Sequence, residues 1–238
     1  MRPKPDPLRS VAIVTGGGRG IGRAVCRRFA ADGAHVVAMA RSSGELDAAV
    51  DACRAAGGTG QSRPVDVSDV TRLAEAIADI AEDLGRIDVL VNCAGAAALG
   101  GVETLPMRAL DDMLNVNVRA VFVACQAVWP IFVRQRRGVI VNVSSVASKD
   151  PFPGLGAYGA CKAWVNTWTV GLANEGRPLG IRVFGVAPGA VETRMLRDHF
   201  PDFPADQCLS PDDVADVIYA LSRPECRCAS GQTVFVRR

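Results

Sequence analysis

A tyrosine and a lysine four residues apart form the pair in this sequence best suited to proton transfer. Tyr158 and Lys162 lie in a stretch whose pattern predicts a helix over residues 157–177, and residues i and i+4 share one face of a helix. A unit positive charge about 4 Å from a phenol is worth roughly 4 kcal/mol at an effective dielectric of 20, or about three pKa units. We therefore expect Lys162 to bring the pKa of Tyr158 from about 10 towards about 7, where a general acid–base works best. Taken alone, the pair also fits a helix with a packed tyrosine and a solvated lysine.

A serine at the end of a predicted strand is the natural companion of this pair. Ser145 follows the apolar run 139–143 and precedes Tyr158 by thirteen residues. Ligands of open α/β sheets bind at the carboxyl ends of the strands, so the strand ends at Thr15, Asn92 and Ser145 should line one crevice. A turn or helix-capping hydroxyl is the commoner use of serine at such a place. The conjunction of the three residue types, rather than any one of them, indicates a catalytic site.

A glycine-rich turn with the pattern T-G-x-x-x-G-x-G follows the first predicted strand and opens a predicted helix. Glycine lets backbone amides approach a phosphate closely, and the helix N-terminus behind the turn carries partial positive charge. The spacing is neither G-x-G-x-x-G nor that of a Walker loop. Its place after the first strand of a βαβ unit nevertheless predicts a dinucleotide site, built from Thr15, Gly16, Gly18, Arg19, Gly20, Ile21 and Gly22.

The residues after the second predicted strand bear on which dinucleotide binds. An NAD site places an acid there for the ribose 2′-hydroxyl, but here Arg41 follows the strand and the nearest acid, Glu45, comes a turn later. Arg19 and Arg41 are suited to hold a 2′-phosphate, with Ser42 and Ser43 as further donors. Two solvated surface arginines are the alternative. Together with the missing acid, the pattern favours NADP(H) over NAD(H).

Short β-branched runs alternate with longer amphipathic stretches along the whole chain. The runs are nearly continuously apolar, as buried parallel strands are, so the alternation predicts an α/β fold: a parallel sheet of about seven strands with helices on both faces. We expect strands at 11–14, 35–38, 61–65, 87–91, 139–143, 181–186 and 233–236, and helices at 20–32, 44–57, 69–84, 107–136, 157–177 and 211–222.

The chain shows no linker and no repeat beyond the βα unit, which predicts a single domain over residues 1–238. Residues 1–8 are expected to form a mobile tail. The stretch 189–211 is rich in proline and irregular, and a loop of that length in a compact domain is usually functional. We expect it to be a substrate lid, with a poorly ordered surface excursion as the alternative.

Composition excludes several function classes. Hydrophobic residues make up 49% and charged residues 22% of the 238 residues, which excludes a disordered chain. A formal net charge of +2 and 5% aromatics argue against a nucleic-acid partner. The longest apolar stretch, 120–133, is shorter than the roughly 20 residues of a membrane span, and the N-terminus lacks the apolar core of a signal peptide. We expect a cytoplasmic protein with neither membrane nor nucleic-acid partners, whose eight cysteines are reduced and bind no metal.

Taken together, these motifs resemble the short-chain dehydrogenase/reductase family over nearly the whole chain. The glycine-rich turn looks like the family's cofactor loop, and Ser145, Tyr158 and Lys162 match its catalytic triad at the usual spacing. Asn117 falls where the family has its fourth catalytic residue. Further cofactor contacts are implied by similarity: Asp66 and Val67 for the adenine ring, Asn92, Ala94 and Gly95 in the family's N-N-A-G motif, and Pro188, Gly189, Val191 and Thr193 for the nicotinamide carboxamide.

The resemblance implies a Rossmann-like doubly wound fold and a hydride transfer between a nicotinamide and a carbonyl carbon. Tyr158 would exchange the proton on the oxygen, Lys162 would lower the pKa of Tyr158 and hydrogen-bond the nicotinamide ribose, and Ser145 would donate to the substrate oxygen. Asn117 would hold a water molecule behind the lysine. The expected activity is the NADPH-dependent reduction of a ketone, either a 3-oxoacyl group or a small carbonyl or hydroxy-acid compound. A catalytically silent NADP-binding sensor or scaffold is the alternative from another class.

Two departures from the family pattern concern substrate and assembly. Cys93 stands where the second Asn of N-N-A-G is usual, and the C-terminus lacks the Asp-Gly-Gly ending of many relatives. That missing ending and the short segment after Pro188 resemble the branch acting on small hydroxy acids and dicarbonyls. An unusual number of large apolar groups on two long predicted helices indicates a homo-dimer or homo-tetramer; they are Phe122, Val123, Trp129, Phe132, Trp164 and Trp168.

Overall fold

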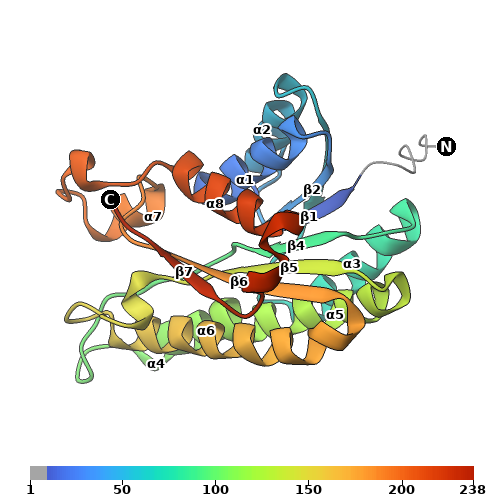
Figure 1. Cartoon of the computed structure of the whole chain (residues 1–238). Helices are drawn as coiled ribbons and strands as arrows, with labels where there is room; N and C mark the ends of the chain where they lie inside the picture. The colour runs from blue at the N-terminus through green and yellow to red at the C-terminus, as the bar shows by residue number, and fades with distance from the viewer. Residues whose placement is uncertain (1–9) are drawn as a thin grey trace.

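A computed structural model describes residues 10–238, and its centre is a seven-stranded sheet. All neighbouring strands run parallel in the order β3-β2-β1-β4-β5-β6-β7, as Figure 1 shows. The strands are β1 (Val11–Thr15), β2 (His35–Ala40), β3 (Thr59–Pro64), β4 (Val89–Asn92), β5 (Gly138–Val143), β6 (Ile181–Pro188) and β7 (Thr233–Val236). The predicted doubly wound fold is confirmed, including the weakly signalled third strand.

Helices cover both faces of the sheet, one layer above it and one below it in Figure 1. The upper layer holds α1 (Gly20–Ala31), α2 (Ser43–Ala55) and α8 (Pro211–Ser222), and the lower layer holds α3 (Val70–Leu84), α4 (Met107–Leu114), α5 (Ala120–Gln135) and α6 (Gly156–Gly176). A short helix, α7 (Arg194–His199), lies outside both layers in the segment after β6.

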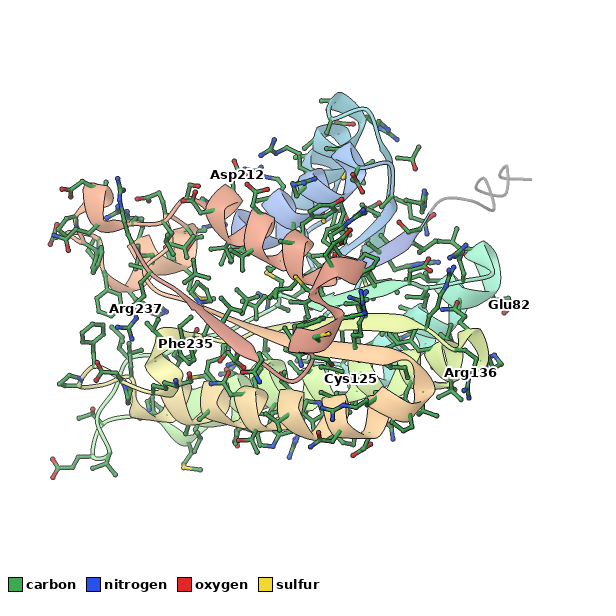
Figure 2. All side chains as sticks on the ribbon, viewed as in Figure 1. Glu82, Cys125, Arg136, Asp212, Phe235 and Arg237 are labelled. Atoms are coloured by element: carbon green, nitrogen blue, oxygen red, sulfur yellow. The ribbon has the colours of Figure 1, made fainter. Side chains whose placement is uncertain are left out.

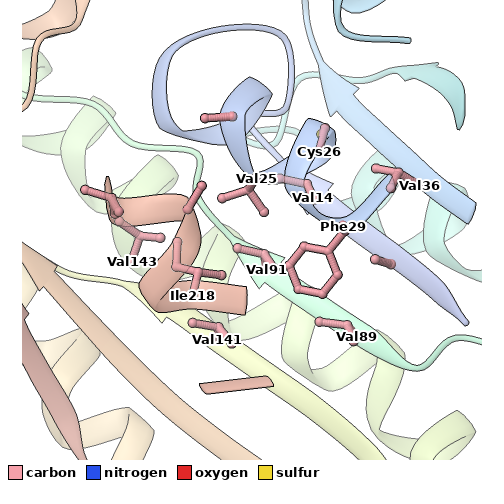
Figure 3. Close-up of a cluster of buried hydrophobic side chains, with 14 of the residues drawn as sticks. Val14, Val25, Cys26, Phe29, Val36, Val89, Val91, Val141, Val143 and Ile218 are labelled. Atoms are coloured by element: carbon pink, nitrogen blue, oxygen red, sulfur yellow. The ribbon is translucent and has the colours of Figure 1, made fainter. Parts of the chain in front are cut away.

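Alternating side chains of the strands build two separate cores. In β1, Ala12 and Val14 face the upper layer, where Phe29 and Ile218 pack against them, and Figure 3 shows this cluster around Val14. Ile13 of the same strand faces the lower core. Because side chains on a strand point alternately to opposite faces, the nearly continuous apolar runs seen in the sequence are what a sheet covered on both sides requires.

The order of the strands places a crevice at the carboxyl ends of β1 and β4. The chain moves outward from β1 to β2 and β3, and then returns to β4 on the other side of β1. At this point of reversal the connecting loops diverge, which is where open α/β sheets bind ligands. The residues after Thr15, Asn92 and Val143 therefore meet at one edge of the sheet, as expected from the sequence.

The long predicted helix at 107–136 is one helical stretch with an interruption. Between α4 and α5 runs a turn of π-helix, Asn115–Arg119, and such turns occur frequently at functional sites. By length and composition the helical stretch Met107–Gln135 could cross a membrane, since 18 consecutive residues of it have a mean hydropathy of 1.6, but a helix in a protein core meets the same criterion. Its buried side chains, among them Val121, Val128 and Ile131, belong to the lower core.

The segment 189–211 contains an α-helix, α7, that the sequence pattern does not predict. Thr193 caps α7 by accepting a hydrogen bond from the Leu196 amide at 3.3 Å. Val191 and Leu209 form a parallel bridge at the base of the segment, and Arg197 donates to the Pro201 and Phe203 carbonyls. The segment is thus a structured excursion rather than an irregular one. The predicted tail at 1–8 lies outside the described residues.

Candidate active site

The glycine-rich turn between β1 and α1 leaves no room for side chains. Gly16 has a φ of +67° and a Cβ there would lie 2.8 Å from the Ala94 backbone, while a Cβ at Gly22 would lie 2.1 Å from the Gly16 carbonyl oxygen. Backbone is the neighbour in both cases, so neither contact can be relieved by moving a flexible side chain. The turn is therefore packed directly against the loop after β4 and against its own helix.

The N-terminus of α1 is open to an anion. Arg19 occupies the N-cap position without a side-chain capping bond, and the first turn contains no acid. The leading amides of a helix have no intrahelical partner, and here they belong to Gly20, Ile21 and Gly22. Together with the close backbone turn, these donors fit the pyrophosphate of a dinucleotide.

Two of the predicted cofactor residues use their side chains inside the protein. The Thr15 hydroxyl oxygen accepts hydrogen bonds from the Cys93 and Ala94 amides at 3.1 and 3.2 Å, which ties the end of β1 to the loop after β4. The Asn92 amide donates to Asn142 at 2.9 Å, and Asn142 in turn donates to the Thr169 hydroxyl at 3.0 Å. These buried contacts position the backbone that faces the crevice, where Ala94 and Gly95 follow.

The predicted 2′-phosphate residues gather where β2 ends, together with two acids. Ser42 caps α2 by accepting from the Glu45 amide at 3.3 Å, which leaves its hydroxyl proton free to donate. Arg19 Nη1 lies 3.4 Å from Glu45 Oε1, and Arg41 Nη1 lies 3.9 Å from Asp66 Oδ2. The pKa of Asp66 is lowered because hydrogen bonds from Ser68 and the charge of Arg41 outweigh its partial burial. The neighbouring Val67 is buried in the lower core.

Asn117 lies in the π-turn, fully buried. Its side-chain amide donates to the Ala96 carbonyl at 2.7 Å and its Oδ1 accepts from the Ala96 amide at 3.2 Å. The same Oδ1 is 3.4 Å from the place where a Cβ at Gly95 would lie. The residue thus holds the loop after β4 against the lower helices, beside the crevice.

Ser145 and Tyr158 are brought together as predicted. Ser145 caps a short 3-10 turn after β5 by accepting from the Ala147 amide at 3.2 Å, and its hydroxyl is close enough to the phenol of Tyr158 to lower the pKa of that phenol. Burial has the larger effect and raises the pKa of Tyr158 to about 12. The expectation that Lys162 brings this pKa towards 7 is therefore wrong in this structure.

The position of the lysine explains why. Lys162 is 3% exposed, and its Nζ donates to the Val143 carbonyl at 3.0 Å while standing 5.8 Å from the centre of the Tyr158 ring. Burial lowers the pKa of Lys162 to about 8. Sharing a helix face brings the two side chains to one site, but the ammonium points at a backbone carbonyl rather than at the phenol oxygen.

The segment after β6 lies against the same crevice. Gly189 donates to the Val236 carbonyl at 2.9 Å, which joins the end of β6 to β7, and the Thr193 hydroxyl donates to the carbonyl of the buried Val191 at 3.2 Å. Pro188 is the last residue of β6. Met195, which the sequence analysis does not single out, places its Cε 3.9 Å from the Cβ position at Gly95. The sequence hints at a role for Met195 only through its position, two residues after Thr193 in the segment expected to form a lid.

The outer rim of the site is partly aromatic and cationic. Phe235 and Arg237 lie at the end of β7, between the segment carrying α7 and the lower helical layer (Figure 2). Lys149, four residues after Ser145, places its Nζ 4.1 Å from the centre of the Phe235 ring.

The cysteine that departs from the family's N-N-A-G motif is not ionised: burial raises the pKa of the Cys93 thiol to about 12. No group of three or more His, Cys, Asp or Glu side chains within residues 10–238 is arranged to hold a metal ion.

The chain is similar to known oxidoreductases over its whole described length. Residues 10–203 match the family model described as short chain dehydrogenase. The chain is 35% identical to 3-oxoacyl-(acyl-carrier-protein) reductase FabG of Thermotoga maritima, over 95% of each protein. It is 38% identical to a short chain dehydrogenase of Pseudocercospora fijiensis over 77% of this chain, which is 60% of that one. A solved short chain dehydrogenase from Burkholderia cenocepacia J2315 in complex with NADP is similar with a TM-score of 0.88 and 34% identity, over 98% of both chains.

Proposed function

The chain belongs to the short-chain dehydrogenase family, and from that premise we propose that it is an NADPH-dependent oxidoreductase acting on a ketone or the corresponding secondary alcohol. The observation that carries the proposal is the arrangement of Ser145, Tyr158 and Lys162. A serine and a tyrosine that interact with each other, with a buried ammonium beside them, lie at the strand ends where the dinucleotide crevice opens. Such a set can bind a carbonyl oxygen and supply its proton.

The raised pKa of Tyr158 leaves the phenol in its proton-donating form. A phenol with a pKa of about 12 is fully protonated at neutral pH, so it can donate a proton to a carbonyl oxygen that gains charge. Ser145 donates a second hydrogen bond to that oxygen. When bound, NADPH supplies the hydride that adds to the carbonyl carbon. Lys162, with a pKa of about 8, is mostly charged at pH 7 and stabilises the phenolate left after proton transfer. Asn117 positions the loop carrying Gly95, and the water relay implied by the family resemblance remains a prediction.

The substrate class is proposed more coarsely. The similarity to a 3-oxoacyl reductase supports a β-keto compound, and the short segment after Pro188 supports a small carbonyl or hydroxy acid. The test is oxidation of NADPH, followed by absorbance, against a panel of β-ketoacyl thioesters, diketones, keto acids and sugars. A catalytically silent sensor is the second candidate, but it has no need of a tyrosine placed beside Ser145 and Lys162. We also propose that the protein is cytoplasmic and binds neither nucleic acid nor membrane.

NADPH is expected to bind at least tenfold more tightly than NADH, which corresponds to about 1.4 kcal/mol. This expectation is based on Arg19 and Arg41 near the end of β2, because guanidinium groups bind phosphate strongly. Replacing Arg41 with Asp should reverse the preference, because an acid there repels a 2′-phosphate and can accept from a 2′-hydroxyl. Fluorescence titration of both cofactors measures the ratio. Equal affinities in the wild-type protein would remove the basis for this assignment.

A homo-oligomer is expected to form through the outer faces of α5 and α6. The ring centres of Phe122, which is 39% exposed, and Trp168 are 5.2 Å apart, and Trp168 stacks on Trp164 with 5.4 Å between the ring centres. Val170 is a further exposed apolar residue of α6. An exposed aromatic patch of this kind usually marks an interface. Phe132 was expected to contribute, but it is fully buried in the lower core and packs against Gly138.

The oligomer is tested by the pair of substitutions Phe122→Asp and Val170→Glu, which should yield a monomer in light scattering at micromolar concentration. Val102→Glu is the matched control, because Val102 is an equally apolar and fully exposed residue on the loop before α4. A wild-type protein that is already monomeric would contradict the prediction.

A further inference from the structure

Three consecutive residues at the start of α7 touch three different parts of the cofactor crevice. The Cγ2 of Thr193 lies 3.2 Å from where a Cβ at Gly20 would be, at the start of α1, and Met195 approaches Gly95 after β4. Between them, Arg194 Nη1 lies 3.2 Å from Glu45 Oε1, in the first turn of α2. The start of α7 therefore lies against the start of α1, the loop after β4 and the first turn of α2.

Glu45 shares one carboxylate oxygen between two arginines. Its Oε1 also accepts from Arg19 Nη1 at 3.4 Å, so a residue of the glycine-rich turn and a residue of the lid segment meet on the same acid. Gly18 makes the approach possible, because a Cβ there would lie only 3.0 Å from the Glu45 Cβ. The Ser42 cap fixes the backbone of Glu45 at the start of α2. Glu45 thus stands beside the residues proposed to hold a 2′-phosphate.

A carboxylate at this place opposes the binding of a 2′-phosphate in two ways. It competes with the phosphate for Arg19, and its negative charge repels the phosphate directly. Arg194 offsets both effects, because a second cation on the same oxygen weakens the hold of Glu45 on Arg19 and cancels its charge. NAD(H) carries no charge on the 2′-oxygen, so its affinity should not respond to this balance.

We propose that Arg194 is a specificity-determining residue that acts through Glu45: it neutralises the acid beside the 2′-phosphate and so favours NADP(H) over NAD(H) from the lid side of the crevice. The inference rests on the proposed preference for NADP(H). It adds that the contact of α7 with Glu45 depends on whether the bound cofactor carries a 2′-phosphate. Binding linkage is reciprocal, so the 2′-phosphate stabilises the contact of α7 with Glu45 to the same extent.

The first test is a double-mutant cycle on cofactor affinity at low salt. Dissociation constants of NADPH and NADH are measured by fluorescence titration for the wild type, Arg194→Ala, Glu45→Gln and the double variant. All three side chains are substantially solvent-exposed, so we expect changes of about threefold: weaker NADPH binding for Arg194→Ala and tighter binding for Glu45→Gln. The double variant should behave like Glu45→Gln alone, and Arg194→Lys should restore most of the loss. NADH affinity should stay constant throughout.

The second test measures the protection of the α7 backbone and does not require turnover of a substrate. Hydrogen exchange of the amides of residues 194–199 is followed with saturating NADPH and with saturating NADH. We expect slower exchange with NADPH than with NADH in the wild type, and no difference between the cofactors in Arg194→Ala or Glu45→Gln. A wild-type lid that exchanges equally with both cofactors would overturn the coupling.

Arg197→Ala is the matched control. Arg197 is a cation of the same short helix, but it pairs with Glu192 rather than Glu45, so its loss should loosen the segment without changing the ratio of NADPH to NADH affinity. A ratio that falls as far as in Arg194→Ala would overturn the inference. Equal losses from Arg194→Ala with and without Glu45→Gln would also overturn it, because the effect would then not pass through Glu45. A wild type without NADPH preference would instead refute the proposed cofactor.

Discussion

The Tyr158→Phe protein is expected to bind NADPH within a few-fold of wild type and to turn over at least about 100-fold more slowly. The substitution keeps the ring and removes only the hydroxyl, so packing around the half-buried side chain is preserved. What is lost is the proposed proton donor beside Ser145. General acid–base assistance is typically worth 100- to 10,000-fold, and no other phenol is near the site. Fluorescence titration of NADPH beside steady-state turnover separates the two effects.

The second tyrosine of the chain provides a matched control. Tyr219 lies on α8, where its ring packs edge-on against Phe29 with 5.4 Å between the ring centres and lies under the Arg28 guanidinium. Tyr219→Phe makes the same chemical change far from the crevice and should leave turnover unchanged. A Tyr158→Phe protein as active as Tyr219→Phe would show that the proton comes from elsewhere.

Replacing Lys162 with Met is expected to weaken NADPH binding, to lower turnover by at least about tenfold, and to change the pH dependence of stability. The folded-state pKa of Lys162 is about 8, below its ordinary value near 10.4. Between these values the unfolded chain binds the extra proton, so the free energy of unfolding of the wild type rises with pH in that window. The gain relative to Lys162→Met should reach about 2 kcal/mol between pH 8 and pH 10 and be absent below about pH 7.

Urea denaturation of both proteins at pH 7, 8, 9 and 10 measures this difference in the free energy of unfolding. Groups that titrate identically in the two proteins do not contribute to the difference. Lys149→Met, which makes the same substitution at an exposed lysine, is the matched control. Parallel pH profiles for the wild type and Lys162→Met would mean that the ammonium is not held in a desolvated position.

The sheet and the proposed catalytic set could be predicted from the sequence because their signals are local. Nearly continuous β-branched runs identify buried parallel strands, and the i, i+4 spacing places Tyr158 and Lys162 at one site. Spacing does not say where a flexible ammonium points, however, and Lys162 donates to the Val143 carbonyl instead of approaching the phenol oxygen. The expected sign of the Tyr158 pKa shift was wrong for that reason.

Other features depend on contacts between distant residues. The helix α7 has six residues, too few for a periodic pattern, and prolines surround it, so the sequence predicts a substrate lid at 189–211 but not the helix within it. The π-turn at Asn117 leaves the apolar pattern of its long helix intact. Amphipathic patterning could not tell that Phe132 faces the sheet while Phe122 faces outward. In the sequence, Glu45 stands out only as an acid one turn beyond the place where an NAD site has its acid. Its pairing with Arg194 joins residues 149 positions apart and is not visible in local spacing.

The most direct test of the central claim is isotope transfer from NADPH carrying deuterium at the reactive nicotinamide carbon. The protein is incubated with the panel of carbonyl compounds, and the products are examined by mass spectrometry. The account predicts an alcohol with one deuterium on the former carbonyl carbon, formed by the wild type and Tyr219→Phe and at least about 100-fold more slowly by Tyr158→Phe. A wild-type protein that binds NADPH but transfers no deuterium to any member of a broad panel would contradict the account and favour the sensor.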